Sequence, residues 1–366
     1  MNFQCLMILS LAVLLTGLGM ALIFGFRRRR RLKDVYQKYY LKRGPRIVVI
    51  GGGTGLAVLL RGLKEYTSNL TAIVSAADDG GSSGRLRGEF GILPPGDLRN
   101  CLVALADTEP AMEALFNYRF AKGEMSGHNL GNLLITALAD ISGSFETAIH
   151  EVGKVLAIRG RVLPSTLDSI VLAAELRDNT VVKGESNIPR SRGQIKRVFT
   201  IPPNPRPVQE AVEAILEADT VVLGPGSLYT SVIPNLLVPG IVEAIEQSSA
   251  KKIYVCNIMT QPGETLGYSA AGHLQAIYQH TKKGLVDYII VNAEEIPPEL
   301  LQKYSAEGAQ AVTVDTDKLE RLKVKIIAEK LFQEQAYIRH HPDKLAQLIV
   351  KKTAEGKYVF FHPNQR

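Results

Sequence analysis

Four glycines within five residues form the most distinctive chemical feature of this chain. Gly51, Gly52, Gly53, Thr54 and Gly55 follow the apolar run 47–50 directly, and the stretch 56–66 has a helical pattern. Glycines allow a sharp turn and a close approach of the backbone, and the first N–H groups of the following helix face a ligand. A phosphate is the expected ligand. The alternative is a turn built for geometry alone, because Leu56 occupies the third glycine position of the dinucleotide fingerprint.

A second glycine turn repeats this order of elements. Gly224, Pro225, Gly226 and Ser227 follow the apolar run 220–223. The hydroxyls of Ser227 and Thr230 are suited to donate to phosphate oxygens at the start of a helix. We therefore expect a second anion site here.

Carboxylates and hydroxyls follow another predicted strand, 71–76. Asp78 and Asp79 precede Gly80, Ser82 and Ser83, and a separate motif at 96–100 carries Asp97. These oxygens suit either the hydroxyls of a ribose or a divalent cation held by Asp78, Asp79 and Asp97. The alternatives are a solvated acidic turn and, for Asp97, an ion pair with Arg99.

The motif 127–132 places two asparagines before an apolar helical stretch, 133–141. We expect one of Asn129 and Asn132 to cap that helix and the other to contact a ligand. His128 is the only histidine inside a motif, and the others lack the spacing of zinc ligands. The sequence also lacks a nucleophile elbow and a Walker A loop, which argues against a serine hydrolase and a P-loop enzyme.

These motifs need a scaffold, and alternating β-branched and helical stretches predict a mainly parallel, Rossmann-like α/β sheet with helices on both faces. The carboxyl ends of such strands meet at one edge, so we expect the motifs to converge there. Residues 151–205 instead predict a small antiparallel insertion, followed by a proline-rich connector at 202–207. The predicted strands are 46–50, 71–76, 220–223, 252–256, 288–291 and 323–327, with extended pieces at 170–174, 180–182 and 196–201.

The N-terminus reads as a membrane anchor. Residues 1–26 carry no charge and are almost entirely apolar, and six basic residues lie between Arg27 and Lys33. About 20 apolar residues span a bilayer as a helix, and a basic flank marks the cytoplasmic side. We therefore expect one transmembrane helix (1–26), a basic juxtamembrane linker (27–43) that contacts anionic lipids, and a cytoplasmic domain (44–366) at the inner (plasma) membrane. A cleaved signal peptide is the alternative, but the basic residues follow the apolar run.

Charge and cysteine content limit the function classes. The net charge is +7, and the 27–33 cluster supplies six of these charges, which leaves +1 for residues 34–366. This near-neutral domain is not expected to bind nucleic acid through phosphate contacts. The three cysteines form no C-x-x-C pair, and we expect no disulfide.

Together, the motifs at 51–55, 78–84, 94–100, 127–132, 224–231 and 259–268 resemble the YvcK/CofD family, and particularly its YvcK branch, the gluconeogenesis factors. The resemblance extends from about residue 44 to about residue 350. It implies a pocket for a UDP-sugar such as UDP-N-acetylglucosamine and a regulatory role in cell shape and wall synthesis on gluconeogenic carbon sources. Cell-wall synthesis proteins and a second copy of the chain are the implied partners.

The resemblance also adds detail to the site and leaves a second function open. It brings Tyr229 into the site, and it makes Tyr268 a nucleotide-sugar contact because an aromatic ring can stack on a base or sugar. CofD-like members are instead transferases that move a phospholactyl group with Mg²⁺. The anchor departs from the family pattern, and so does Lys303, where arginine is expected; lysine lacks the bidentate fork that suits a diphosphate.

Overall fold

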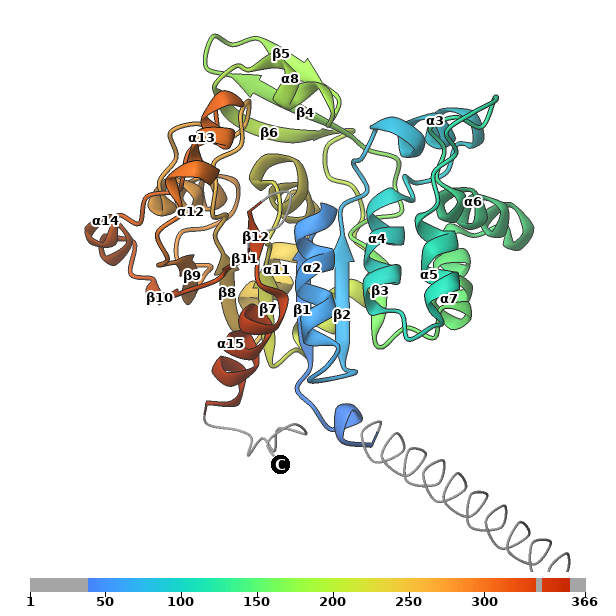
Figure 1. Cartoon of the computed structure of the whole chain (residues 1–366), viewed down its shortest axis with the longest axis horizontal. Coiled ribbons are helices and arrows are strands. Elements are labelled where there is room, and N and C mark those ends of the chain that lie inside the picture. The colour runs from blue at the N-terminus through green and yellow to red at the C-terminus, as the bar shows by residue number, and fades with distance from the viewer. Residues whose placement is uncertain (1–38, 334–337, 356–366) are drawn as a thin grey trace, which may run out of the picture.

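A seven-stranded parallel sheet forms the centre of the molecule (Figure 1). The computed structural model describes residues 39–333 and 338–355. The strand order is β10-β9-β8-β7-β1-β2-β3, and each neighbouring pair runs parallel. Its strands are β1 (Ile47–Gly51), β2 (Leu70–Val74), β3 (Arg161–Pro164), β7 (Thr220–Leu223), β8 (Lys251–Val255), β9 (Tyr288–Asn292) and β10 (Lys325–Glu329). The parallel sheet and six of its strands were predicted from the sequence, whereas β3 was not.

Strand β1 explains why the sheet is covered on both sides. Its side chains alternate between two apolar cores: Val48 and Ile50 belong to one, and Ile47 and Val49 to the other. Side chains two residues apart point to the same face of a strand, so a continuously apolar strand needs cover on both faces. The helices supply that cover.

Two groups of helices form the outer layers. One core contains side chains from α2, α4, α5, α6, α7 and α15, and the other from α8, α9, α10, α11, α12 and α14. The helices of the first core are α2 (Gly53–Leu63), α4 (Gly96–Leu105), α5 (Pro110–Asn117), α6 (Leu130–Ser142), α7 (Phe145–Val155) and α15 (Pro342–Ala354). Those of the second are α8 (Asn187–Ser191), α9 (Gln209–Leu216), α10 (Ile233–Leu236), α11 (Ile241–Gln247), α12 (Ala270–His280) and α14 (Thr316–Arg321). Side chains of η1 (Leu228–Val232) also belong to the second core, and the other helices are α3 (Gly81–Phe90) and α13 (Pro298–Ala306).

The predicted antiparallel insertion is confirmed. Strands β4 (Val171–Leu176), β5 (Val181–Lys183) and β6 (Ile195–Ile201) form a separate antiparallel sheet in the order β5-β4-β6. This small sheet lies beyond the carboxyl ends of the central strands (Figure 1). A two-stranded hairpin, β11 (Phe332–Gln333) with β12 (Arg339–His340), precedes α15.

The predicted transmembrane helix, 1–26, and most of the basic linker lie outside the described residues. Within residues 39–333 and 338–355, no single helix combines the length and apolar composition needed to cross a membrane. One bent pair, Leu228–Leu236 with Ile241–Gln247, meets those criteria jointly with a 72° bend. The apolar side chains of this pair belong to the second of the two cores, which also contains α9 and α12.

Candidate functional site

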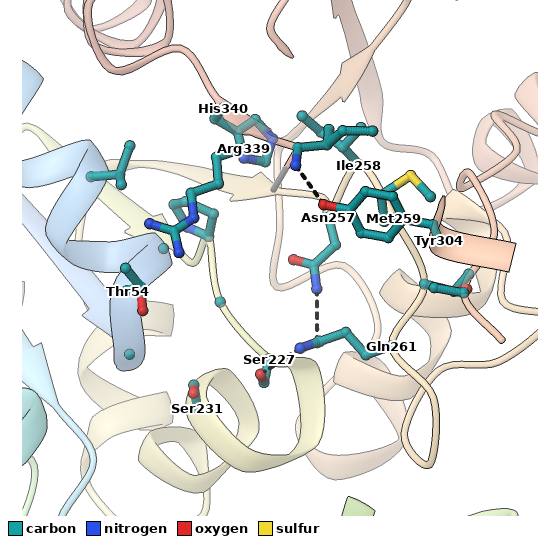
Figure 2. A pocket seen from close by; sticks show the side chains of 18 of the residues that line it. Thr54, Ser227, Ser231, Asn257, Ile258, Met259, Gln261, Tyr304, Arg339 and His340 are labelled. Atoms are coloured by element: carbon teal, nitrogen blue, oxygen red, sulfur yellow. Dashed lines mark hydrogen bonds between the residues drawn. The ribbon is translucent and has the colours of Figure 1, made fainter. Parts of the chain in front are cut away.

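The two glycine turns meet at the point where the strand order reverses. The chain passes from β1 to β2 on one side, whereas β7 pairs with β1 on the other. Loops diverge at such a switch point and leave a crevice in which open α/β sheets bind ligands. A cavity of about 360 Å³ lies there (Figure 2). Its lining includes Gly52, Gly53, Thr54, Gly55, Pro225, Gly226 and Ser227.

Backbone contact between these turns explains the need for glycine. The N–H of Gly224 donates to the carbonyl of Ile50 at 2.8 Å. A Cβ atom at Gly55 would lie 2.8 Å from the carbonyl oxygen of Pro225. Gly53 has a φ of +65°, a conformation that residues with a side chain rarely adopt. Geometry therefore requires these glycines, and the same geometry leaves the N–H groups of both turns beside one cavity.

Asp97 lies behind the first glycine turn. Its Oδ2 accepts a hydrogen bond from the N–H of Gly53 at 2.7 Å. Burial, and then the charge of Asp78, raise the pKa of Asp97 to about 6. Arg99, the ion-pair partner of Asp97 in the alternative interpretation, donates to the carbonyl of Phe116 and to Asn100 instead. The carboxylate of Asp97 thus helps to hold the first glycine turn in its conformation.

A chain of side-chain hydrogen bonds joins the ends of β8 and β7. The amide of Asn257 donates to Gln261 at 3.2 Å, and Gln261 donates to the hydroxyl of Ser227 at 2.8 Å (Figure 2). All three residues line the cavity. They fix the orientation of Ser227, which the sequence singled out as a phosphate donor.

The C-terminal hairpin supplies the cation that the sequence analysis missed. Arg339, on β12, lines the cavity, and its side chain extends into it (Figure 2). Tyr304 lines the same cavity, and its hydroxyl accepts a hydrogen bond from the N–H of Ile338. Lys303, where we expected arginine, is not among the lining residues. A guanidinium group is supplied instead by Arg339, which lies far from the glycine turns in the sequence. Apart from the arginine itself, the sequence around this position contains no motif that predicts a site.

His340 is a second lining residue that the sequence analysis missed. It is 7% exposed, and burial lowers its pKa to about 4. Its ring is therefore neutral near pH 7. The Nε2 atom is buried and has no hydrogen-bond partner among the described residues.

The predicted acidic motif lies next to this cavity but outside its lining. Asp78 accepts from the N–H of Gly80 at 2.9 Å, and Asp79 from the N–H of Ser186 in the insertion at 2.9 Å. Burial, and then the neighbouring carboxylates, raise the pKa of Glu185 to about 8. Glu185 was not predicted, and nothing in its sequence context marked it.

These carboxylates do not fit the predicted metal site. Asp78, Asp79 and Asp97 are each directed to a different backbone N–H. Over the described ranges, no group of three or more His, Cys, Asp and Glu side chains is arranged to hold a metal ion. The three carboxylates thus form no ready-made Mg²⁺ site, whereas a cation held by fewer of them together with ligand phosphates stays a prediction.

The serines and asparagines of the neighbouring motifs stabilise loops. Ser83 accepts from the N–H of Gly96, and Ser82 accepts from the N–H of Asn129. Asn129 caps α6 by accepting from the N–H of Asn132 at 3.2 Å. The Oδ1 of Asn132 is buried and has no hydrogen-bond partner within the described part of the chain. Capping is thus assigned to Asn129, and ligand contact by Asn132 stays a prediction.

Tyr229, Thr230 and Tyr268 are not among the residues that line the cavity. The hydroxyl of Thr230 donates to Glu264, and Tyr229 is only 1% exposed. The hydroxyls of Tyr229 and Tyr268 are 2.8 Å apart. Tyr268 lines a different hollow, beside α12 and β6. Ligand contact by these three residues stays a prediction.

Comparisons with known proteins agree with this architecture. The family model for 2-phospho-L-lactate transferase CofD matches residues 47–332. A protein named gluconeogenesis factor from Halalkalibacterium halodurans is 53% identical, covering 85% of this chain and 96% of that protein. The Bacillus subtilis protein of the same name is 51% identical, with 84% and 97% covered. A crystal structure of a Bacillus halodurans protein has a TM-score of 0.83 and 53% identity, covering 84% and 99%.

Proposed function

The chain belongs to the CofD family, and we propose that it acts as a gluconeogenesis factor, a regulator that binds a UDP-sugar of the UDP-N-acetylglucosamine type. Such a regulator would support cell morphogenesis and wall synthesis on gluconeogenic carbon sources. The names of its relatives support the first part of this proposal. The geometry of the cavity supports the ligand.

The observation that carries the proposal is the shared cavity of two glycine turns and one arginine. Backbone N–H groups at the start of a helix favour phosphate oxygens. We assign one phosphate to the turn 52–55 and the other to Gly226 and Ser227. The planar guanidinium of Arg339 can donate two parallel hydrogen bonds to a diphosphate.

The rest of the cavity suits the remainder of a nucleotide sugar. Ile258, Met259 and Tyr304 belong to one small apolar cluster, and all three line the cavity. Such a wall suits the flat face of a base, because an aromatic or apolar surface packs well on it. Asn257 and Gln261 also line the cavity and offer amide groups to the hydroxyls of the ligand.

Isothermal titration calorimetry tests this proposal. Purified full-length protein should give saturable heat with UDP-N-acetylglucosamine, and Arg339→Ala should weaken it by about tenfold or more. UMP, which lacks the second phosphate and the sugar, should bind more weakly. Absence of saturable heat with any UDP-sugar would refute the proposal.

A second candidate function is group transfer from a nucleotide diphosphate donor, as the name of the family model implies. The carboxylate of Asp97 beside the first turn is the observation that favours it. We place the regulator first because relatives at 53% and 51% identity are named gluconeogenesis factor. Release of a nucleoside monophosphate with candidate acceptors, followed by mass spectrometry, would establish turnover.

We also retain the membrane anchor as a proposal based on the sequence. The described chain begins near the amino ends of the strands, whereas the glycine turns lie at their carboxyl ends (Figure 1). An anchor at residues 1–26, with Arg27–Lys33 on anionic lipids, would leave the cavity open to the cytoplasm. Membrane fractionation of the full chain and of a variant lacking residues 1–33 tests this location.

A further inference from the structure

A second hollow, of about 530 Å³, lies between the small antiparallel sheet and α12. We call it the basic groove; its lining includes Arg177, Lys196, Arg197, Tyr268, Gln275 and Gln279. Strand β6 is an edge strand of the β5-β4-β6 sheet. The groove therefore has an edge strand on one side and a helix on the other.

The charge of this groove is one-sided. Arg177, Lys196 and Arg197 are all exposed, and the described residues that line the groove include no carboxylate. Glu175 lies nearby and pairs with both Lys196 and Arg197, each at 2.6 Å. One carboxylate is thus shared between two of the three cations, so the positive charges outnumber the negative one. The resulting positive field favours an acidic partner.

The shape and side chains of the groove favour a polypeptide over a small anion. Gln275 and Gln279 are exposed one turn apart on α12, so both amides face the same side. Amides that can both donate and accept suit the backbone of an extended segment. None of the lining residues forms a glycine turn at a helix start like the one that receives phosphate at the cavity.

The groove is connected to the cavity through η1. The hydroxyl of Tyr268 contacts that of Tyr229, whose backbone N–H donates to Glu264 at 3.1 Å. The hydroxyl of Thr230 also donates to Glu264, at 3.1 Å. Ser227 and Ser231, at the cap and within η1, line the cavity. These contacts link the lining serines to Tyr268 through η1.

We propose that the basic groove binds an acidic segment of a partner protein and that occupancy of the cavity alters its affinity for that segment. The coupling rests on the proposed function, whereas binding at the groove does not. Coupling between two sites requires an element that responds to both, and η1 is that element here.

A unique fluorophore makes the groove directly observable. The chain contains no tryptophan, so Gln279→Trp places a single reporter in the groove. A matched protein with Ile141→Trp reports from an exposed position on α6. We expect an oligoglutamate peptide to change the fluorescence of the Gln279→Trp protein saturably and in a salt-dependent manner, and to leave the Ile141→Trp protein unchanged.

Charge removal decides whether the groove is the binding site. Adding Arg177→Ala, Lys196→Ala and Arg197→Ala to the Gln279→Trp protein should weaken the peptide by about tenfold or more. An unchanged affinity in a variant with unchanged thermal stability would overturn the proposal. Displacement of the peptide by inorganic pyrophosphate would also overturn it, because the groove would then be a small-anion site.

The coupling has its own readout. Saturating UDP-N-acetylglucosamine should change the peptide affinity by about fivefold or more, and Tyr268→Phe should abolish that change. Equal peptide affinity with and without a sugar that calorimetry shows to be bound would overturn the coupling. If calorimetry shows that no UDP-sugar binds, the proposed function fails, and the peptide titration still decides the groove.

Discussion

The carboxylate of Asp97 accepts the backbone N–H of Gly53 at a distance of 2.7 Å. An anionic oxygen thus already occupies one N–H of the turn that begins α2. This internal contact illustrates the kind of group that the helix start attracts. It also places a titratable group where a bound phosphate would sense its charge.

The first prediction concerns the pH dependence of ligand binding. The pKa of Asp97 is about 6, so its carboxylate is negative above that pH and opposes a bound diphosphate. A bound anion raises this pKa further, so binding takes up a proton and affinity should rise as pH falls from 8 to 5. Asp97→Asn should flatten that profile and bind several-fold more tightly at pH 8. Parallel profiles for the two proteins, measured by calorimetry, would contradict this role.

The second prediction concerns the contact between the two glycine turns. Gly55→Ala would place a Cβ atom 2.8 Å from the carbonyl oxygen of Pro225, so the turns must separate. We expect about tenfold weaker UDP-sugar binding and a lower melting temperature. Gly88→Ala is the control, because a Cβ at this position of α3 meets nothing within 4 Å. That variant should bind normally and gain about 0.5–1 kcal/mol of stability.

The third prediction asks whether ligand binding depends on the positive charge of Arg339 or on the paired N–H donors of its guanidinium group. Arg339→Lys keeps the positive charge but loses the paired donors, so we expect roughly tenfold weaker binding of a UDP-sugar. Arg61→Lys, on the exposed end of α2, serves as the matched control. Lys303→Arg should change affinity little, because Lys303 does not line the cavity. Recovery of affinity in an Arg339→Lys protein by adding Lys303→Arg would instead place the diphosphate near α13.

The fourth prediction concerns the stability contribution of Glu264. Burial raises the pKa of Glu264 to about 7, above the value of 4.5 expected in the unfolded chain. The folded state therefore holds the proton more tightly, and the contribution of this group to stability is lost as pH rises from 4.5 to 7. Glu264→Gln removes this pH-dependent loss of folding stability, which amounts to up to about 3 kcal/mol for the glutamate. Chemical denaturation of both proteins at pH 5 and pH 8 should show the variant gaining relative stability at pH 8; a constant difference would refute it.

The sequence was sufficient to predict much of the fold. Continuous apolar runs such as 220–223 mark strands buried on both faces, and that strand has the predicted bounds. Strand β3 was missed because Arg161–Pro164 begins with an exposed charge and ends with proline. Only its pairing with β2 at the edge of the sheet makes it a strand.

The cavity was predictable where its residues follow strands and not where tertiary contacts bring them in. The turns 51–55 and 224–227 were identified from glycine spacing, and all their residues except Gly51 and Gly224 line the cavity. Arg339 and His340 reach it through a two-residue hairpin strand that carries no motif. Tyr268 was assigned to the ligand site by resemblance, but it lines the basic groove and not the cavity.

A crystal structure of the protein with UDP-N-acetylglucosamine tests the central claim most directly. The account predicts the diphosphate between the N–H groups of residues 54–55 and those of Gly226 and Ser227, with the guanidinium of Arg339 across both phosphates. A diphosphate bound elsewhere, for example in the basic groove beside Tyr268, would contradict it.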